Sequence, residues 1–156
     1  MSQTAGVGKR RQLVMTGDIN RGGNEMRAIA EGLFTDETPP RLIGGKDRET
    51  GRIIFPCPSP STHEPVPLSR DGKLWSYTVQ RFRPKSPPYL GPDAFAPWVV
   101  AYVELPGEVI VEARLDGVAF EDVTVGMPVR FKPGLLDRND PASARIPAFV
   151  PAELAV

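Results

Sequence analysis

The sequence has very few of the residues from which disulfides and metal centres are built. Cys57 is the only cysteine and His63 the only histidine among the 156 residues. A single cysteine cannot form an intramolecular disulfide, and it cannot supply a cysteine-rich zinc site. We therefore expect a cytoplasmic protein that folds without disulfides.

The sequence also lacks an excess of charge and any long apolar run. Its 19 basic side chains are balanced by 19 acidic ones, so the formal net charge is zero. A neutral chain has no general electrostatic attraction for nucleic acid or anionic membrane, although a local basic patch stays open. No apolar stretch approaches the roughly 20 residues of a membrane helix, and no signal-peptide pattern is present. We expect no membrane contact.

A recognisable catalytic set is missing as well. Cys57 and His63 are residue types that form a nucleophile with its base, or half of a metal site. Neither a third ligand nor an orienting residue lies near them in the sequence, and no two carboxylates have an interpretable spacing. We therefore predict no catalytic residue and no metal site in this chain.

Strand-forming sequence, by contrast, is concentrated between residues 73 and 132. Residues 73–82 (KLWSYTVQRF) are rich in aromatic and β-branched side chains, which suit a half-buried pleated surface. Residues 98–105 (WVVAYVEL) are nearly all apolar, which predicts a strand buried on both faces. Residues 108–115 (EVIVEARL) alternate, which predicts one apolar and one polar face.

The segments between these strands indicate how the strands connect. Pro106-Gly107 lies between two of them and is typical of a hairpin turn. Residues 119–123 suit one helical turn, and Pro128 can open a fourth strand that contains Val129 and Phe131. This order predicts a mainly β fold, the OB-fold, which is a five-stranded Greek-key barrel.

The barrel is predicted to span residues 66–156, with a last short strand over 145–151. Residues 1–23 are expected to form a flexible tail. Residues 24–33 (NEMRAIAEGL) predict a short helix capped by Asn24. Packing on the barrel and docking on another protein are equally open roles for this helix, whose apolar face consists of Met26, Ile29, Ala30 and Leu33.

Residues 41–60 have the outline of a zinc-ribbon hairpin. Two short strands, over 42–45 and 52–55, flank a polar turn, and the proline-rich sequence FPCPSP follows at 55–60. Residues 59–67 are predicted to be a loop. We assign the predicted helix and this hairpin, residues 24–65, to an N-terminal extension of the barrel.

A cationic loop between the first two barrel strands is the main candidate for ligand binding. Arg81, Arg83 and Lys85 place three cations within five residues, close to the aromatic residues Phe82 and Tyr89. The loop favours contacts with phosphates, either of a nucleotide-bearing cofactor or of nucleic acid. The alternative interpretation, a solvated loop without a ligand, stays open.

Several short motifs resemble those of a known family when their order and spacing are taken together. They are GKLWSYT at 72–78, PWVVAYVEL at 97–105, VGMPV at 125–129 and FVP at 149–151. The chain resembles the small acyl-CoA-associated proteins that combine an N-terminal zinc ribbon with a C-terminal OB-fold. This family was long catalogued as a domain of unknown function.

The chain departs from the family in the ribbon, which in the family reads CxxCG…FP…CPxC. Asp47 and Thr50 stand where the first two cysteines would be, and Pro60 replaces the fourth, so only Cys57 remains. One ligand of four cannot hold structural zinc. We predict a ribbon-shaped hairpin without metal, held by the packing of Leu42, Ile54 and Phe55 and by the barrel or a partner.

The resemblance implies a function. Members of the family accompany thiolase-fold enzymes that make or break carbon–carbon bonds on CoA thioesters or transfer acyl groups. The implied role is a non-catalytic accessory subunit in a hetero-oligomer, with Arg81, Arg83 and Lys85 near the CoA phosphates and no tightly bound cofactor. The residues expected at the partner interface are Met26, Ile29, Leu33, Phe55 and Trp75.

The alternative from a different class is a protein that binds single-stranded nucleic acid, which is the best-known use of the OB-fold. Such barrels combine aromatic side chains with a basic groove. Trp75, Tyr77 and Phe82 could serve as the aromatic platform beside the cationic loop. The balanced charge of the chain counts against this alternative.

Overall fold

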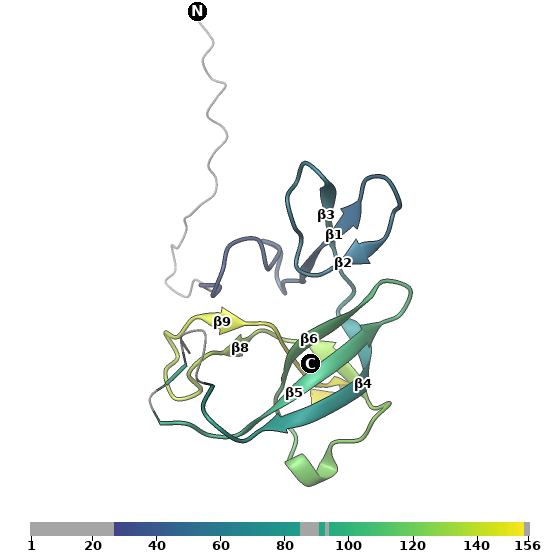
Figure 1. Ribbon diagram of the computed structural model, residues 1–156. Coiled ribbons are helices and arrows are strands. Elements are labelled where there is room, and N and C mark those ends of the chain that lie inside the picture. The colour runs from purple at the N-terminus through teal and green to yellow at the C-terminus, as the bar shows by residue number, and fades with distance from the viewer. Residues whose placement is uncertain (1–26, 85–90, 93, 155–156) are drawn as a thin grey trace, which may run out of the picture.

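The computed structural model describes residues 27–84, 91–92 and 94–154. In this part the chain forms a closed five-stranded barrel, a three-stranded sheet and a two-stranded sheet (Figure 1). Two short 3₁₀ turns complete the described structure: η3 (Phe120–Asp122) and η4 (Ala152–Leu154). No helix within these described residues is long and apolar enough to cross a membrane.

The barrel has the strand order β10-β6-β5-β4-β7 and closes through the pairing of β10 with β7. All neighbouring strands are antiparallel except β10 and β6, which are parallel. The mainly β prediction and the five-stranded OB-fold are confirmed. The barrel strands are β4 (Asp71–Gln80), β5 (Trp98–Leu105), β6 (Val109–Leu115), β7 (Pro128–Phe131) and β10 (Ala148–Pro151).

The turn between β5 and β6 is the predicted hairpin. Gly107 has a φ of 76°, a value that L side chains rarely adopt, and the N–H of Glu108 donates to the carbonyl of Leu105 at 2.9 Å. Glycine reaches this conformation without steric cost. The predicted helical turn over 119–123 is also present, as the 3₁₀ turn η3.

Strand β5 differs from its prediction on one face. Val99, Ala101, Val103 and Leu105 point into the barrel and are almost fully buried. The other face, which was expected to be buried too, is only half-buried at Trp98 and exposed at Glu104. The outer wall of the barrel is therefore partly open, because no second layer of structure covers its full length in the described part of the chain.

Strand β6 follows its predicted alternation, with one exception. Val111, Ala113 and Leu115 are buried, whereas Ile110 and Glu112 are exposed on the outer face. Arg114 also belongs to the outer face, yet only 8% of it is exposed. A buried arginine on an otherwise open face requires both a cover and a charged partner.

The N-terminal extension forms a three-stranded sheet with the order β2-β1-β3. The predicted hairpin is present as β1 (Ile43–Asp47) and β2 (Ile53–Ile54), but β3 (His63–Pro67) was predicted to be a loop. Pro65 and Pro67 obscured this strand in the sequence. Because β3 is an edge strand, its prolines need not donate ladder hydrogen bonds on their free side.

The helix predicted over residues 24–33 is wrong for its described part, residues 27–33, which consists of turns, bends and an isolated bridge to Arg145. The N–H of Ile29 donates to the carbonyl of Arg145, and the N–H of Arg145 donates to the carbonyl of Arg27. These backbone groups are therefore used in tertiary pairing. A helix this short is marginal without packing.

The predicted last strand, over residues 145–151, is divided into two. Strand β9 (Arg145–Ile146) pairs with β8 (Gly134–Leu135) in a small separate sheet, and Pro147 separates it from β10 in the barrel. In Figure 1 this small hairpin lies beside the barrel. It forms part of the cover over the outer face of β6.

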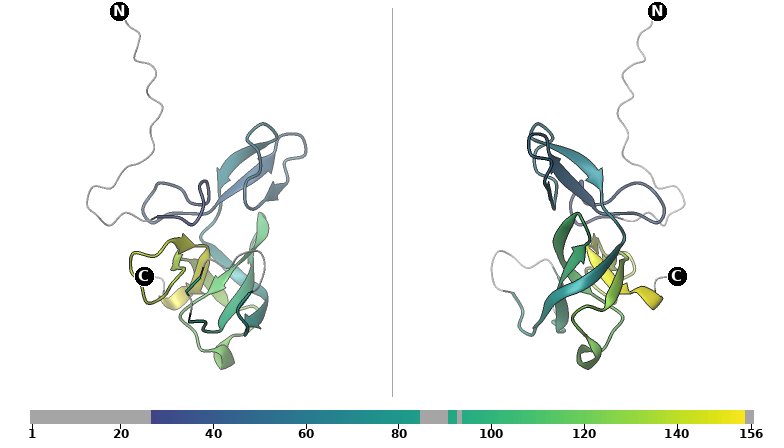
Figure 2. Two further views of the ribbon diagram at one scale, coloured as in Figure 1. Left: turned by 60° about the vertical axis from the view of Figure 1, so that its left-hand side comes forward. Right: turned by 90° about the vertical axis from the view of Figure 1, so that its right-hand side faces the viewer.

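The extension stands at one end of the barrel, where it leads into β4 (Figure 2). Leu42 and Leu68 belong to the same buried cluster as the interior of the barrel, and Phe55 packs against that cluster from the ribbon side. The two parts thus share one hydrophobic core. The expected boundary between residues 65 and 66 falls inside β3, and the division into separate units stays a prediction.

Candidate functional site

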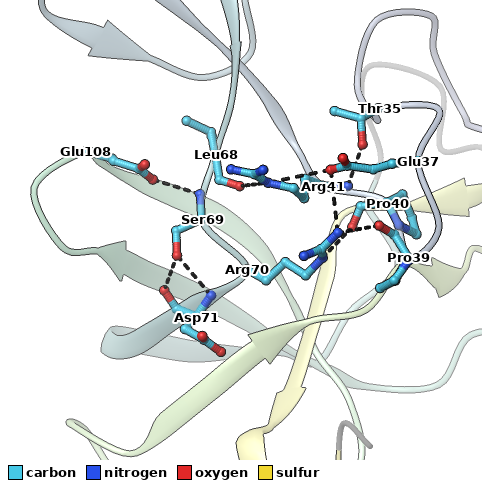
Figure 3. A network of polar contacts seen from close by, with 10 residues as sticks. All are labelled: Thr35, Glu37, Pro39, Pro40, Arg41, Leu68, Ser69, Arg70, Asp71 and Glu108. Carbon is cyan, nitrogen blue, oxygen red and sulfur yellow. Dashed lines mark hydrogen bonds and ion pairs between the residues drawn. The ribbon is translucent and has the colours of Figure 1, made fainter.

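Two arginines connect the extension to the start of the barrel (Figure 3). The Nε of Arg41 donates to the carbonyl of Leu68 at 2.8 Å, and Arg70 donates to the carbonyls of Pro39 and Pro40. Both guanidinium groups also lie near the carboxylate of Glu37, at 3.6 and 3.5 Å. These contacts satisfy backbone carbonyls of the connecting segments and fix their path.

An open hollow of about 730 Å³ lies next to this network. Its lining includes Arg70, Arg130 and Lys132, together with the acidic residues Asp71 and Glu108. Arg130 is paired with Asp71 at 2.6 Å, and Glu108 accepts the N–H of Ser69. Because most of its charges are already matched, the hollow is better explained as a structural junction than as an anion site.

At the tip of the ribbon, Asp47 closes the turn that would be the first zinc knuckle of the resembled family. Its Oδ1 accepts the backbone N–H groups of Glu49 at 2.8 Å and Thr50 at 3.0 Å. These hydrogen bonds, that from Thr50 first, hold the pKa of the Asp47 carboxyl below its ordinary value. The carboxylate is thus directed at the backbone of its own turn.

The remaining knuckle positions also fit zinc poorly. Thr50 and Pro60 offer no thiolate or imidazole, and the described residues contain no group of three His, Cys, Asp or Glu side chains suited to a metal ion. The carbonyl of Pro60 accepts two hydrogen bonds from Arg48 instead. That the ribbon holds no metal stays a prediction for direct measurement.

Cys57 and His63 have different partners from the pair considered in the sequence. The Nδ1 of His63 lies 2.8 Å from Oγ1 of Thr62, and its Nε2 lies 3.8 Å from Oδ2 of Asp47. Cys57 is a half-buried free thiol against the backbone of Gly45. In the described residues no hydrogen bond joins Cys57 and His63, so a thiol activated by this histidine is not assembled.

The cations of the predicted ligand loop follow the end of β4. The guanidinium of Arg81 lies 5.8 Å from the centre of the Phe120 ring, and Nη1 of Arg83 donates to the carbonyl of Pro92 at 2.7 Å. Lys85 lies outside the described residues. The expected phosphate contacts of these three residues stay a prediction.

The expected interface residues lie in different environments. Trp75 is 57% exposed on β4, whereas Phe55 is half-buried against the core. Ile29 and Leu33 are half-buried in the segment that replaces the predicted helix, and Met26 lies outside the described residues. Among the described residues of this expected interface, only Trp75 presents a large apolar surface to solvent.

A groove on the outer face of the barrel was missed by the sequence reasoning. Its volume is about 480 Å³, within the usual range of binding sites. Phe55 and Pro56 of the ribbon form one wall, β5 contributes Trp98 and Val100, and the segment around Ile146 forms the opposite wall. A second hollow of about 200 Å³ adjoins it and shares Trp98, Arg114 and Leu136 with it.

Arg114 is the buried cation of this groove. Its Nε and Nη2 donate to the two carboxylate oxygens of Asp116 at 2.7 and 2.9 Å, and Arg138 donates to the same carboxylate at 3.1 Å. A Cβ on Gly134 would come within 2.5 Å of Nη2 of Arg114, so only glycine lets the backbone of β8 cover the pair. The alternation of β6 predicts that Arg114 faces outward. The residues that cover it, around Gly134, follow some 20 positions later in the chain, so the sequence pattern does not show its burial.

The architecture defines the class of protein: an OB-fold barrel preceded by a small ribbon-like sheet. Residues 65–132 match the family described as the C-terminal OB-fold domain of ChsH2. The match begins within β3, at the end of the ribbon-like sheet, so it supports the barrel and leaves the zinc ribbon unshown.

Two individual relatives agree with this family. A DUF35 domain-containing scaffold protein of Methanocaldococcus jannaschii is 30% identical over 95 residues, which cover 56% of this chain and 64% of the relative. The solved structure of the Ltp2-ChsH2(DUF35) aldolase contains a chain that is 26% identical, with a TM-score of 0.53, covering 71% of this chain and 84% of that one. The predicted resemblance is confirmed: the barrel is an OB-fold that is similar to the C-terminal domain of ChsH2 and to DUF35 relatives.

Proposed function

We propose that this protein is a non-catalytic accessory subunit of a thiolase-fold enzyme that acts on acyl-CoA thioesters. The observation that carries the proposal is the similarity to a chain of the Ltp2-ChsH2(DUF35) aldolase, supported by the relative described as a scaffold protein. The reaction of the enzyme subunit is carbon–carbon bond formation, carbon–carbon bond cleavage or acyl transfer. The hetero-oligomer is cytoplasmic.

The chemistry of the described residues supports a non-catalytic role. His63 lies next to Thr62 and Asp47, away from the thiol of Cys57, and the carboxylate of Asp47 accepts two backbone N–H groups. A nucleophile, its base and an orienting group in mutual hydrogen-bond reach are not present among these residues. The reacting groups are therefore assigned to the larger subunit.

In the complex, the small subunit stabilises the enzyme subunit and borders its CoA channel. Arg81, Arg83 and Lys85 contact the CoA phosphates, because guanidinium and ammonium groups form strong charge-assisted hydrogen bonds with phosphate. The contact surface with the enzyme includes Met26, Ile29, Leu33, Phe55 and Trp75. The ribbon binds no zinc.

Affinity purification of the tagged chain from its native host tests the proposal. We expect mass spectrometry to identify a stoichiometric thiolase-fold protein, and the double variant Cys57→Ala/His63→Ala to leave the turnover of the purified complex unchanged. A chain recovered alone would contradict the proposal, as would loss of turnover in the double variant.

The same sample tests the alternative function in single-stranded nucleic-acid binding. Phe82, which is 80% exposed, and the exposed Trp75 would supply stacking surfaces in that case. Recovery of nucleic acid, with an affinity for oligonucleotides that falls steeply with salt, would support this alternative and replace the accessory-subunit proposal.

A further inference from the structure

Arg114 and Gln80 each place in the groove a hydrogen-bonding group that no described residue uses. Asp116 occupies Nε and Nη2 of Arg114, which leaves the N–H groups of Nη1 without a partner in the described part of the chain. The Nε2 of Gln80 donates to the carbonyl of Phe82 at 2.7 Å, which leaves Oε1 of Gln80 in the same situation. Both residues line the groove.

The strand register sets the spacing of the two strands that carry these groups. Gln80 on β4 is paired with Trp98, and Arg114 on β6 is paired with Val100, so β5 runs between them. Neighbouring strands lie about 4.8 Å apart, so the two backbones are separated by roughly 10 Å. Val100, which also lines the groove, forms the apolar floor between them.

This pattern matches an extended peptide. An extended chain advances about 3.3 Å per residue, so about three of its residues span the distance between β4 and β6 and offer both carbonyl and N–H groups on the way. The groove also shares lining residues with the adjoining hollow, which suits a chain that continues from one into the other. A small ligand, by contrast, is usually held in an enclosed pocket that buries most of its surface.

The charges around the groove disfavour an anionic ligand. Arg114 is already neutralised by Asp116, which also accepts from Arg138. Glu112 lines the main groove and Asp137 lines the adjoining hollow. Together with Asp116, these side chains place three carboxylates near the two guanidinium groups. A neutral acceptor such as a backbone carbonyl therefore suits Arg114 better than a carboxylate or phosphate does.

We propose that this groove binds an extended, largely apolar segment of the enzyme subunit. One backbone carbonyl of the segment accepts from Nη1 of Arg114, one N–H donates to Oε1 of Gln80, and an apolar side chain of the segment packs on Val100. The identity of the partner rests on the proposed function, whereas the position of the docking groove rests on the geometry of β4, β5 and β6.

Binding of the purified thiolase-fold subunit to variants of the full chain tests this groove. Val100→Asp places a charge on the apolar floor and lowers the affinity by about 100-fold. Gln80→Leu keeps the size of the side chain but removes the Oε1 acceptor together with the Nε2 donor to Phe82, and lowers the affinity by about 5- to 10-fold. Arg114→Lys keeps a cation for Asp116 while removing the Nη1 donors, and lowers the affinity similarly.

Ile110→Asp is the matched control, because Ile110 is exposed on the outer face of β6 and does not line the groove. It is expected to change the affinity by less than about twofold, as for a surface substitution outside a contact. Circular dichroism of each variant confirms that the barrel is folded before binding is measured.

The outcomes separate the two proposals. Loss of affinity in Val100→Asp and Gln80→Leu, with Ile110→Asp unchanged, supports the proposal that the groove is the docking site. If Val100→Asp, Gln80→Leu and Arg114→Lys all bind the enzyme subunit as tightly as the unaltered chain does, the groove is not the docking site. The accessory-subunit proposal is left standing by that result. If the unaltered chain forms no complex, both proposals fail.

Discussion

Asp47 shows at the scale of one residue how a ribbon turn can be closed without a metal. In the resembled family a cysteine would stand here, whereas the Asp47 carboxylate accepts the N–H groups of Glu49 and Thr50. A side chain that accepts backbone N–H groups in this way stabilises a turn locally. The turn is therefore stabilised by hydrogen bonds between its own residues.

Two substitutions at Asp47 separate hydrogen bonding from charge. Asp47→Ala removes the acceptor and is expected to lower the melting temperature, whereas Asp47→Asn keeps an acceptor oxygen and is expected to lower it less. Because the folded pKa is depressed, the extra stability of the carboxylate is present above its ordinary pKa of 3.8 and is lost as the pH falls through the folded value.

Thermal melts of the three proteins between pH 7 and pH 2 measure this effect. The difference between the unaltered chain and Asp47→Asn should shrink below about pH 4. A difference that stays constant across this range would show that the charge of Asp47 has no role in the turn.

The Arg114–Asp116 pair is the second residue-scale feature with a clear energetic consequence. Asp116→Ala leaves a buried guanidinium without its carboxylate and should lower the free energy of unfolding by about 3–5 kcal/mol. Asp71→Ala breaks an exposed pair with Arg130 and should lower it by less than about 1 kcal/mol. Urea titration compares the two variants, and equal losses would contradict the structural role of the buried pair.

At the scale of elements, periodicity predicted the barrel strands and failed where tertiary contacts decide the conformation. The alternation of β6 and the apolar run of β5 identified both strands. Residues 27–33 contain apolar side chains at helical spacing, yet their backbone pairs with Arg145. That pairing partner lies more than 100 residues away, so local sequence could not reveal it.

The candidate sites show the same limit. The cationic residues Arg81 and Arg83 were visible in the sequence because they are close together in it. The groove was not visible, because Phe55, Trp98 and Ile146 come from three separate elements that meet only in the fold. The ion pair of Arg114 with Asp116, two residues later, was the one local signal for it.

The segment after β4 yields a prediction about the substrate. Reversal of charge in Arg81→Glu/Arg83→Glu is expected to raise the KM of the complex for its acyl-CoA substrate by about 10-fold or more, with a smaller change in kcat, because the proposed phosphate contacts are lost. Steady-state kinetics of the complex provides the measurement, with Lys73→Glu as a control on β4. An unchanged KM would exclude these arginines from CoA binding.

At the scale of the whole molecule, the ribbon and barrel share one core and are expected to unfold together. Leu68 is fully buried between β3 and β4. Leu68→Ala should lower the free energy of unfolding by about 2–5 kcal/mol, whereas truncation of the exposed Val125 to alanine should cost less than about 0.5 kcal/mol.

Denaturant titrations followed separately by a ribbon probe and by tryptophan fluorescence should give coincident transitions for the unaltered chain and for Leu68→Ala. Two separate transitions in Leu68→Ala would mean that the extension is an independent unit.

The central claim concerns assembly, since a non-catalytic subunit has its function only in a complex. Native mass spectrometry of the material purified from the host, combined with metal analysis of the same sample, tests the claim most directly. We predict a particle that contains this 17.0 kDa chain and a thiolase-fold subunit in a whole-number ratio, without zinc bound to this chain. A free 17.0 kDa chain, or a particle of this chain with nucleic acid, would contradict the account.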